Sequence, residues 1–255
     1  SDWSSDVCSS DLGESITAWS AVLQGTDPGF SGYDGGRYLD VCASHGYVAS
    51  YLRAGVFFRK NLAVLRAARL ASIPVRQHPG RVKTGPIAGL MPDTDALAGV
   101  IHDLATYTSL DNARFSGAQP VKGRPRGEWY FTSRTMAAST SDYSEVQRIR
   151  VMCVAATAAL AALAEYVGDD VETKTDGTGR LTERAAQAIE QYVAAAVAQA
   201  VKVAPNEHVT AVAALANRTD NILSTGILRV AVTLVPRGTR SEEHTSELQS
   251  LRHIS

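Results

Sequence analysis

Cysteine is scarce in this sequence, and the few cysteines lack the spacing of a disulfide framework or a zinc site. The 255 residues include three, Cys8, Cys42 and Cys153, which lie far apart. Small secreted domains held together by disulfides carry closely spaced cysteines in even number. A reducing compartment is therefore the simplest interpretation. Cys42 and Cys153 lie in apolar stretches, so we expect each to be a small buried side chain rather than a reactive thiol.

Long hydrophobic runs and an excess of one charge are also missing. No apolar run reaches the roughly 18 residues that a membrane-crossing helix needs, and no charged-then-apolar signal segment opens the sequence. The formal net charge is −1, whereas proteins that bind nucleic acid neutralise its phosphates with an excess of Lys and Arg. The sequence therefore predicts neither a membrane nor a nucleic acid as a partner.

The two ends of the chain are related to each other as DNA rather than as protein. Residues 240–250 can be encoded by DNA whose reverse complement, shifted by one base, encodes residues 2–11. Two protein termini have no physical reason to be antisense copies, and the shared oligonucleotide resembles the adapter ligated to fragments in short-read sequencing. We therefore expect residues 1–12 and 240–255 to be adapter-derived scars and exclude them from reasoning about the fold.

The remaining residues, 13–239, are expected to be an internal piece of a longer protein because they begin without Met. They contain 23 basic and 20 acidic residues, so their formal charge is +3. Hydrophobic residues make up 45% of the chain, enough for one large or two small globular domains. We predict a partial N-terminal lobe at 13–80 and a second domain at 81–239, with a linker at 79–90, where Gly and Pro are frequent.

We call residues 13–239 the insert. The first half of the insert shows a mixed pattern of short elements. Residues 38–42 alternate well enough for a strand, and 57–72 have the pattern of a basic amphipathic helix that Pro74 ends. The basic residues of this helix indicate either an anionic partner or a solvated face, and the short, unrepeated pattern favours the solvated face. A further helix is predicted over 93–107 and a strand within 128–132.

The second half has longer elements. Ser141 or Asp142 is expected to cap a helix to about Val167, whose middle is apolar almost all round and should be buried on several sides. Thr182 is expected to cap another helix, to about Val203. An apolar stripe at three- and four-residue steps marks its buried face. The stripe consists of Ala186, Ile189, Val193, Val197 and Ala200.

Two strands are predicted after these helices, over 208–217 and 227–235. In the second strand, apolar residues alternate with their neighbours, which is typical of a strand with one covered face. These residues are Leu228, Val230, Val232 and Leu234. The order helix, helix, strand, strand indicates an α+β fold, with helices packed on a mostly antiparallel sheet, rather than a doubly wound βαβ sheet.

No constellation of residues predicts a catalytic, cofactor-binding or metal site. The histidines of the insert lack Cys or carboxylate neighbours at metal-ligand spacing. They are His45, His78, His102 and His208. Asp93 and Asp95 could hold a divalent cation as paired carboxylates, but acids at a predicted helix start are more typical of capping.

Two other stretches resemble catalytic or phosphate-binding motifs only superficially. The turn at 174–179 lacks the Gly-Lys-Ser/Thr ending of a phosphate loop and has no apolar strand before it. Ser139, Ser141 and Asp142 lie close together, but no Gly-x-Ser-x-Gly elbow accompanies them. The sequence therefore predicts that the protein is not an enzyme.

Three stretches of the sequence carry a resemblance to a known family. They are RLASIPV at 69–75 with the GRV and GPIAG that follow, WYFTSRTMA at 129–137 leading through SDY into RIRVM, and NILSTG at 221–226 followed by a strand and VPRG. In this order they resemble the C-terminal portion of contractile phage tail sheath and sheath-like tail proteins. The similarity covers roughly 57–239 and is strongest over 129–239. The insert departs from the family in stopping soon after Val235-Pro236 and in lacking the N-terminal part.

The resemblance implies a structural subunit that forms a helical tube around the tail tube and acts by contraction, not catalysis. Its partners would be other sheath subunits, tail tube and baseplate proteins, and it would lie in the virion tail after assembly in the bacterial cytoplasm. Sheath subunits are linked by arms that add strands to neighbouring sheets. The candidate inter-subunit strand is the one that contains Leu228, Val230, Val232 and Leu234. Without terminal arms the fragment should either fold only partly or fail to polymerise, with a strand edge exposed.

Two other interpretations stay open. The insert can be a fragment of an enzyme whose catalytic residues lie outside it, which the full gene would reveal as a nucleophile, metal cluster or phosphate loop. It can also be a tail tube or another non-contractile virion protein. The long apolar helix near 143–167 argues mildly against a tube subunit, because such subunits are expected to be mostly β.

Overall fold

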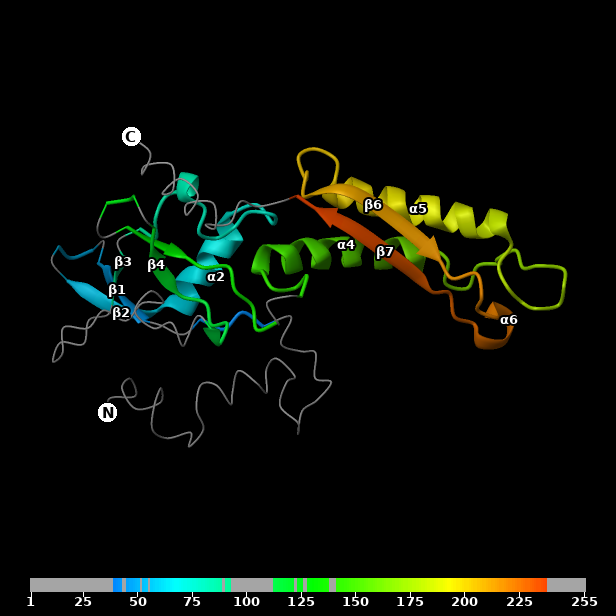
Figure 1. Cartoon of the computed structure of the whole chain (residues 1–255), viewed down its shortest axis with the longest axis horizontal. Coiled ribbons are helices and arrows are strands. Elements are labelled where there is room, and N and C mark those ends of the chain that lie inside the picture. Colours follow the sequence, from blue (N-terminus) through cyan, green and yellow to red (C-terminus); the bar gives the residue numbers. More distant parts are fainter. Residues whose placement is uncertain are drawn as a thin grey trace, which may run out of the picture. The chain divides into compact units, whose positions relative to one another are not determined.

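The structure is a computed structural model that forms two compact units, Ser1–Arg150 and Val151–Ser255 (Figure 1). It describes residues 39–42, 45–50, 52–54, 56–88, 90–92, 112–121, 123–125, 128–137 and 141–237. Both units combine helices with antiparallel strands. The predicted α+β class is therefore confirmed.

The described part of the first unit contains two small sheets, the helix α2 (Leu62–Ser72), the short 3-10 helix η3 (Val82–Thr84) and the first residues of a long helix. The strands β1 (His45–Ala49), β2 (Phe57–Asn61) and β3 (Leu90–Pro92) form an antiparallel sheet in the order β2-β1-β3. The strands β4 (Ala118–Pro120) and β5 (Trp129–Phe131) pair antiparallel in a second sheet. The predicted strand within 128–132 is thus confirmed by β5, whose three side chains are all buried.

The helix predicted over 57–72 is half right. Residues 57–61 form β2, and only α2 (Leu62–Ser72) is helical. The change of conformation falls at Asn61, whose side chain accepts a hydrogen bond from the backbone N–H of Ala63 and caps the helix. Residues 57–61 form a strand despite their helical pattern, because they pair with β1. The pattern of 57–72 alone gives no sign of this partner strand.

The segment 79–90, predicted as a linker, is packed inside the first unit. The backbone N–H of Ile87 donates to the carbonyl of Trp129 (2.8 Å), and Leu90 is buried in the core with Phe131. A Cβ at Gly80 would lie 2.0 Å from the carbonyl oxygen of Phe131, so glycine is required for this close approach. The glycines and prolines here permit tight packing rather than separating two lobes.

Two further predictions for this unit have different outcomes. Of the strand predicted over 38–42, the structure shows an isolated parallel bridge between Cys42 and Ser116 and no ladder at 39–41. The helix predicted over 93–107 lies outside the described residues.

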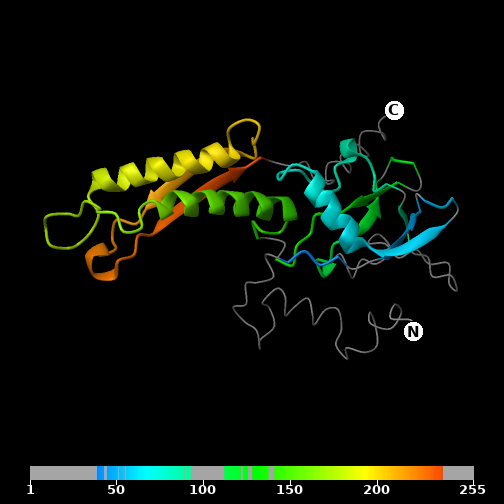
Figure 2. The ribbon, with the colours of Figure 1, turned by 180° about the vertical axis from the view of Figure 1, so that it is seen from behind.

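Two long helices, one short helix and a hairpin form the described part of the second unit. The helix α4 (Val146–Ala164) begins in the first unit and continues into the second, and α5 (Glu183–Val201) follows after a turn. The strands β6 (Val209–Ala216) and β7 (Val230–Pro236) pair antiparallel, and the short α6 (Ile222–Thr225) lies in their connection. Figures 1 and 2 show α4 and α5 on the same side of the β6–β7 sheet.

The helix α5 follows its sequence pattern closely. The Thr182 hydroxyl accepts from the backbone N–H of Ala185 (3.2 Å), which confirms the predicted cap. The predicted stripe is confirmed except at its end, where Val201 is buried and Ala200 is only half-buried. The buried members are Ala186, Ile189, Val193, Val197 and Val201.

The prediction that the apolar middle of the helix ending at about Val167 is buried on several sides is wrong. In α4 the buried residues of the second unit, Val151, Ala155, Ala159 and Ala162, lie on one face, while Leu160 is 69% exposed. Among the described elements, one sheet and one helix are too few to cover a helix all round. By length and composition α4 could cross a membrane, a test that core helices of soluble proteins also pass.

Truncation of the α5 stripe should unfold the second unit much more readily than truncation on α4. We expect Ile189→Ala to lower the free energy of unfolding by about 2–5 kcal/mol, because Ile189 is 2% exposed and its removal leaves a cavity. Leu160→Ala is the matched control and should change it by no more than about 0.5 kcal/mol. Urea unfolding followed by circular dichroism measures both. Equal effects of the two variants would contradict the packing described above.

Candidate functional site

The residues considered for catalysis or metal binding are not brought together in the described part of the chain. No group of three His, Cys, Asp or Glu side chains there could hold a metal ion. The Nδ1 of His78 accepts from the backbone N–H of Gly80, and burial lowers the pKa of His78 to about 4. His208 is buried at the start of β6. Asp93, Asp95, His102 and Ser139 lie outside the described residues.

The turn at 174–179 and the serine near α4 are both occupied by local hydrogen bonds. Asp176 accepts from the backbone N–H and the hydroxyl of Thr178, and these bonds lower the pKa of Asp176. The Ser141 hydroxyl accepts from the backbone N–H of Tyr143. Both arrangements are typical of turns in which a side chain accepts a hydrogen bond from the backbone two residues later.

The basic residues of α2 serve the interior of the first unit. Arg66 is 2% exposed, and its Nε donates to Asp40 (2.5 Å) while its Nη1 donates to the carbonyl of Thr132 (2.5 Å). Arg69 likewise donates to the carbonyls of Pro79 and Gly85. The charges of this helix therefore face neither of the two environments expected from the sequence, because they hold backbone carbonyls inside the fold.

Cys42 and Cys153 differ in how exposed they are. Cys42 packs at the edge of the core beside Arg66, and burial raises the pKa of its thiol to about 12. Cys153 is exposed on α4, so the prediction that it is buried is wrong. Its apolar neighbours in the sequence lie on a helix that is covered on one side only.

The strongest candidate site is the free edge of β7. The backbone N–H of Asn217 donates to the carbonyl of Arg229. This bond shows which residue pairs of the β6–β7 ladder exchange hydrogen bonds: those in step with the pair of Asn217 and Arg229 do, and the pairs between them do not. In an antiparallel pair, alternate residues point their N–H and C=O toward the partner strand and away from it. Val230, Val232 and Leu234 therefore point theirs away from β6. No other strand pairs with β7 within the described chain.

The two faces of this sheet have different surroundings. The side chains of Val230, Val232 and Leu234 are half-buried on the side of the helices. The opposite face carries no charged side chain within the paired strands, and its larger members, Leu215 and Val235, are 62% and 49% exposed. The face consists of Ala211, Ala213, Leu215, Ala231, Thr233 and Val235.

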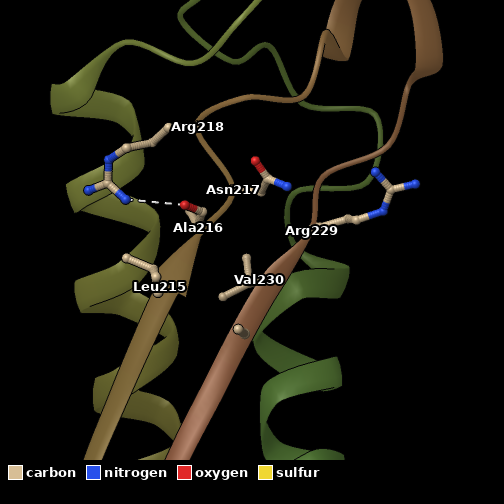
Figure 3. A pocket seen from close by; sticks show the side chains of 7 residues that line it. Leu215, Ala216, Asn217, Arg218, Arg229 and Val230 are labelled. Atoms are coloured by element: carbon tan, nitrogen blue, oxygen red, sulfur yellow. Dashed lines mark hydrogen bonds between the residues drawn. The ribbon is translucent and has the colours of Figure 1, made fainter.

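A shallow hollow lies where the two strands leave the sheet. It measures about 510 Å³ and is lined by residues 215–218 and 229–231. Figure 3 shows Arg218 donating to the carbonyl of Ala216, with Asn217 between Arg218 and Arg229. Both arginines are already paired with carboxylates, Arg218 with Glu183 and Glu190 and Arg229 with Asp220. The hollow is therefore not a ready site for an anion.

Arg218 and two glutamates of α5 form a compact cluster that we call the clamp. Arg218 contacts Glu183 through Nε (2.8 Å) and Glu190 through Nη1 (2.6 Å). Hydrogen bonds from Arg218 lower the pKa of Glu190, and those from Arg218 and Gln187 lower the pKa of Glu183 to about 2. Sequence reasoning missed the clamp. Its signal is weak, since Glu183 and Glu190 are seven residues apart and share a helix face, but nothing in the sequence indicates Arg218.

The candidate inter-subunit strand predicted from the sequence lies largely in β7. Val230, Val232 and Leu234 belong to the strand, whereas Leu228 lies before it in the connection from α6. The three strand residues are thus together on the free edge. Their role in contacts between subunits stays a prediction.

A comparison with models of protein families matches part of the first unit. Residues 14–125 match the model of the family described as DUF2586, N-terminal domain. This range includes most of the first unit's strands and α2, and it does not include β7 or the clamp. No curated protein matches the chain.

The two cysteines should react at very different rates with a thiol reagent. With a pKa of about 12, only on the order of one in ten thousand Cys42 thiols is ionised at pH 8. In a Cys8→Ser background we expect rapid labelling of Cys153 alone, followed by Cys42 after unfolding in urea. Mass spectrometry of the labelled peptides identifies each site. Rapid labelling of Cys42 in the folded protein would contradict the burial described here.

Proline substitutions along β7 should distinguish the two sides of the strand. The N–H of Val232 points to the free edge, so Val232→Pro removes no ladder bond. The N–H of Thr233 points to β6, so Thr233→Pro loses that bond and should cost about 1–3 kcal/mol more of unfolding free energy. Thermal unfolding followed by circular dichroism compares them. If Val232→Pro were the more damaging of the two, the ladder phase would be wrong.

Proposed function

We propose that this protein is a structural subunit of a phage-type contractile tail sheath, which assembles into a helical tube and acts by contraction. The observation that carries the proposal is the free edge of β7, where Val230, Val232 and Leu234 point their backbone groups outward. The order of the three sequence stretches that resemble sheath proteins supports the same function. The proposed partners are other sheath subunits, tail tube and baseplate proteins.

An added strand would join subunits through backbone hydrogen bonds. Residues 230–235 offer about 20 Å of free edge at about 3.4 Å per residue, enough for a strand of usual length. Backbone pairing does not depend on the side chains of either strand, so it can persist while neighbouring surfaces repack. A connection of this kind suits an array that changes from an extended to a contracted form.

The composition of the outer sheet face fits repeated contact between identical subunits. Ala211, Ala213 and Ala231 are small, and no charge lies within the paired strands on this face. Charged residues are depleted at the cores of protein interfaces, so a face without charge suits burial against another subunit. We expect the face to become covered in the assembled tail, which is formed in the bacterial cytoplasm.

Immunogold electron microscopy tests the proposed location. Antibodies raised against the chain should label particles of a phage that encodes it along the whole tail, in extended and in contracted tails, because the sheath is the outer layer in both. Antibody pre-absorbed with the chain is the control. Label confined to the capsid, the baseplate or the tube that contraction exposes would overturn the proposal, as would absence of the chain from purified particles.

A further inference from the structure

The two edges of the β6–β7 sheet differ in what occupies them. On β7, all three residues whose backbone groups point outward meet no strand or side-chain partner among the described residues. On β6, the outward-pointing residues are Val212, Ala214 and Ala216, because they stand opposite those of β7 in the ladder. Of these three residues, Ala216 has both its backbone N–H and its carbonyl hydrogen-bonded to side chains.

The clamp holds both backbone groups of Ala216. Its N–H donates to Oε1 of Glu190 (2.8 Å), and its carbonyl accepts from Nη1 of Arg218 (3.1 Å). The same guanidinium bonds Oε1 of Glu190 (2.6 Å) and both carboxylate oxygens of Glu183 (2.8 and 2.9 Å). A strand added at β6 would have to displace an arginine held by two carboxylates before it could pair with Ala216.

The beginning of β6 is also unsuited to an added strand. The backbone N–H of His208 donates to the carbonyl of Val201 at the end of α5 (2.7 Å), so the chain is tied to the helix there. The ladder shifts register between Val209 and Ala211, and such a bulge twists an edge away from regular pairing. Between bulge and clamp, only Val212 and Ala214 keep outward groups in register.

A sheet with two open edges and a sheet with one open edge assemble differently. Two open edges let copies add to one another without limit, as in a fibre, whereas one open edge accepts one partner strand and then is filled. We propose that the Glu183–Arg218–Glu190 clamp closes the β6 edge, so that the sheet accepts a strand of a second copy only at β7. This inference rests on the proposed function, in which β7 is the acceptor.

Four chains that differ in which edges are open test the inference by sedimentation velocity over a range of concentrations. The natural sequence has one open edge and should not exceed a dimer, in which two β7 edges pair. Val232→Pro blocks β7 and should be monomeric. Glu190→Ala frees the N–H of Ala216 and removes one of the two carboxylates that hold Arg218, so this variant should form assemblies larger than a dimer. The double variant has only β6 open and should return to a dimer at most.

Two controls separate the clamp from a general loss of charge. Glu183→Ala removes a carboxylate from the same arginine but leaves the bond between Glu190 and Ala216, so it should behave as the natural sequence does. Glu190→Gln keeps an acceptor oxygen for the N–H of Ala216, so this variant should also form nothing larger than a dimer. Assemblies of Glu190→Ala no larger than those of the natural sequence, with unchanged circular dichroism and thermal unfolding, would overturn the inference.

Amide hydrogen exchange gives a second readout that does not need association. The Ala216 amide should exchange about tenfold faster or more in Glu190→Ala, while the amides of Ile189 and Val193 in α5 keep their protection. Unchanged exchange at Ala216 would contradict the assigned role of Glu190. If the substitution loosens α5 as a whole, Arg218→Ala frees the carbonyl of Ala216 without altering the helix, and sedimentation of this variant should show assemblies larger than a dimer.

The outcomes also separate this inference from the proposed function. If Glu190→Ala enlarges the assemblies but Val232→Pro changes nothing, the clamp closes β6 and the acceptor role of β7 fails. If Val232→Pro abolishes association but Glu190→Ala adds nothing to it, the acceptor role stands and the clamp is overturned.

Discussion

Two strands that share a single ladder leave every second residue of each strand with an N–H and a C=O that point away from the partner. The second unit is built on such a pair, β6 and β7, and its helices cover one face of the sheet. No third strand joins this sheet in the part of the chain that the structure describes. This constraint decides what the unit can do. Along β6 the outward groups are partly occupied by Glu190 and Arg218, whereas along β7 they meet no partner among the described residues.

The first unit is organised around arginines rather than around a large sheet. Arg66, Arg69 and Arg114 each donate to backbone carbonyls of segments outside helices and strands, and Arg150 donates to the carbonyl of Leu70 in α2. Arg66 makes the deepest of these contacts, with Asp40 as its counter-charge and the Phe131 ring 5.7 Å from its guanidinium carbon. A guanidinium offers five donors in a fixed plane, so one side chain can fix several loops at once. This explains how a segment such as 79–90 can be rich in Gly and Pro and still be packed.

Prediction from the sequence succeeded where one element carries its whole pattern. The stripe of α5, its Thr182 cap and the alternation in β7 are local, and each lies in the structure close to where the pattern places it. Prediction failed where a distant partner decides. Residues 57–61 have a helical pattern but pair with β1, and the apolar α4 is exposed at Leu160 because no described element covers that side. Cys153 lies on the same helix and is exposed too.

By itself, the sequence determined the α+β class, the long helices and hairpin of the second half, and a strand whose alternate residues are apolar. Only the tertiary structure decided which backbone edge of that hairpin is open. The clamp joins Glu190 to Arg218, which are 28 residues apart, and Glu183 to the same arginine across 35 residues. Helix and strand periodicities report neighbours within a few residues, whereas the state of a sheet edge depends on side chains that the fold brings from elsewhere in the chain.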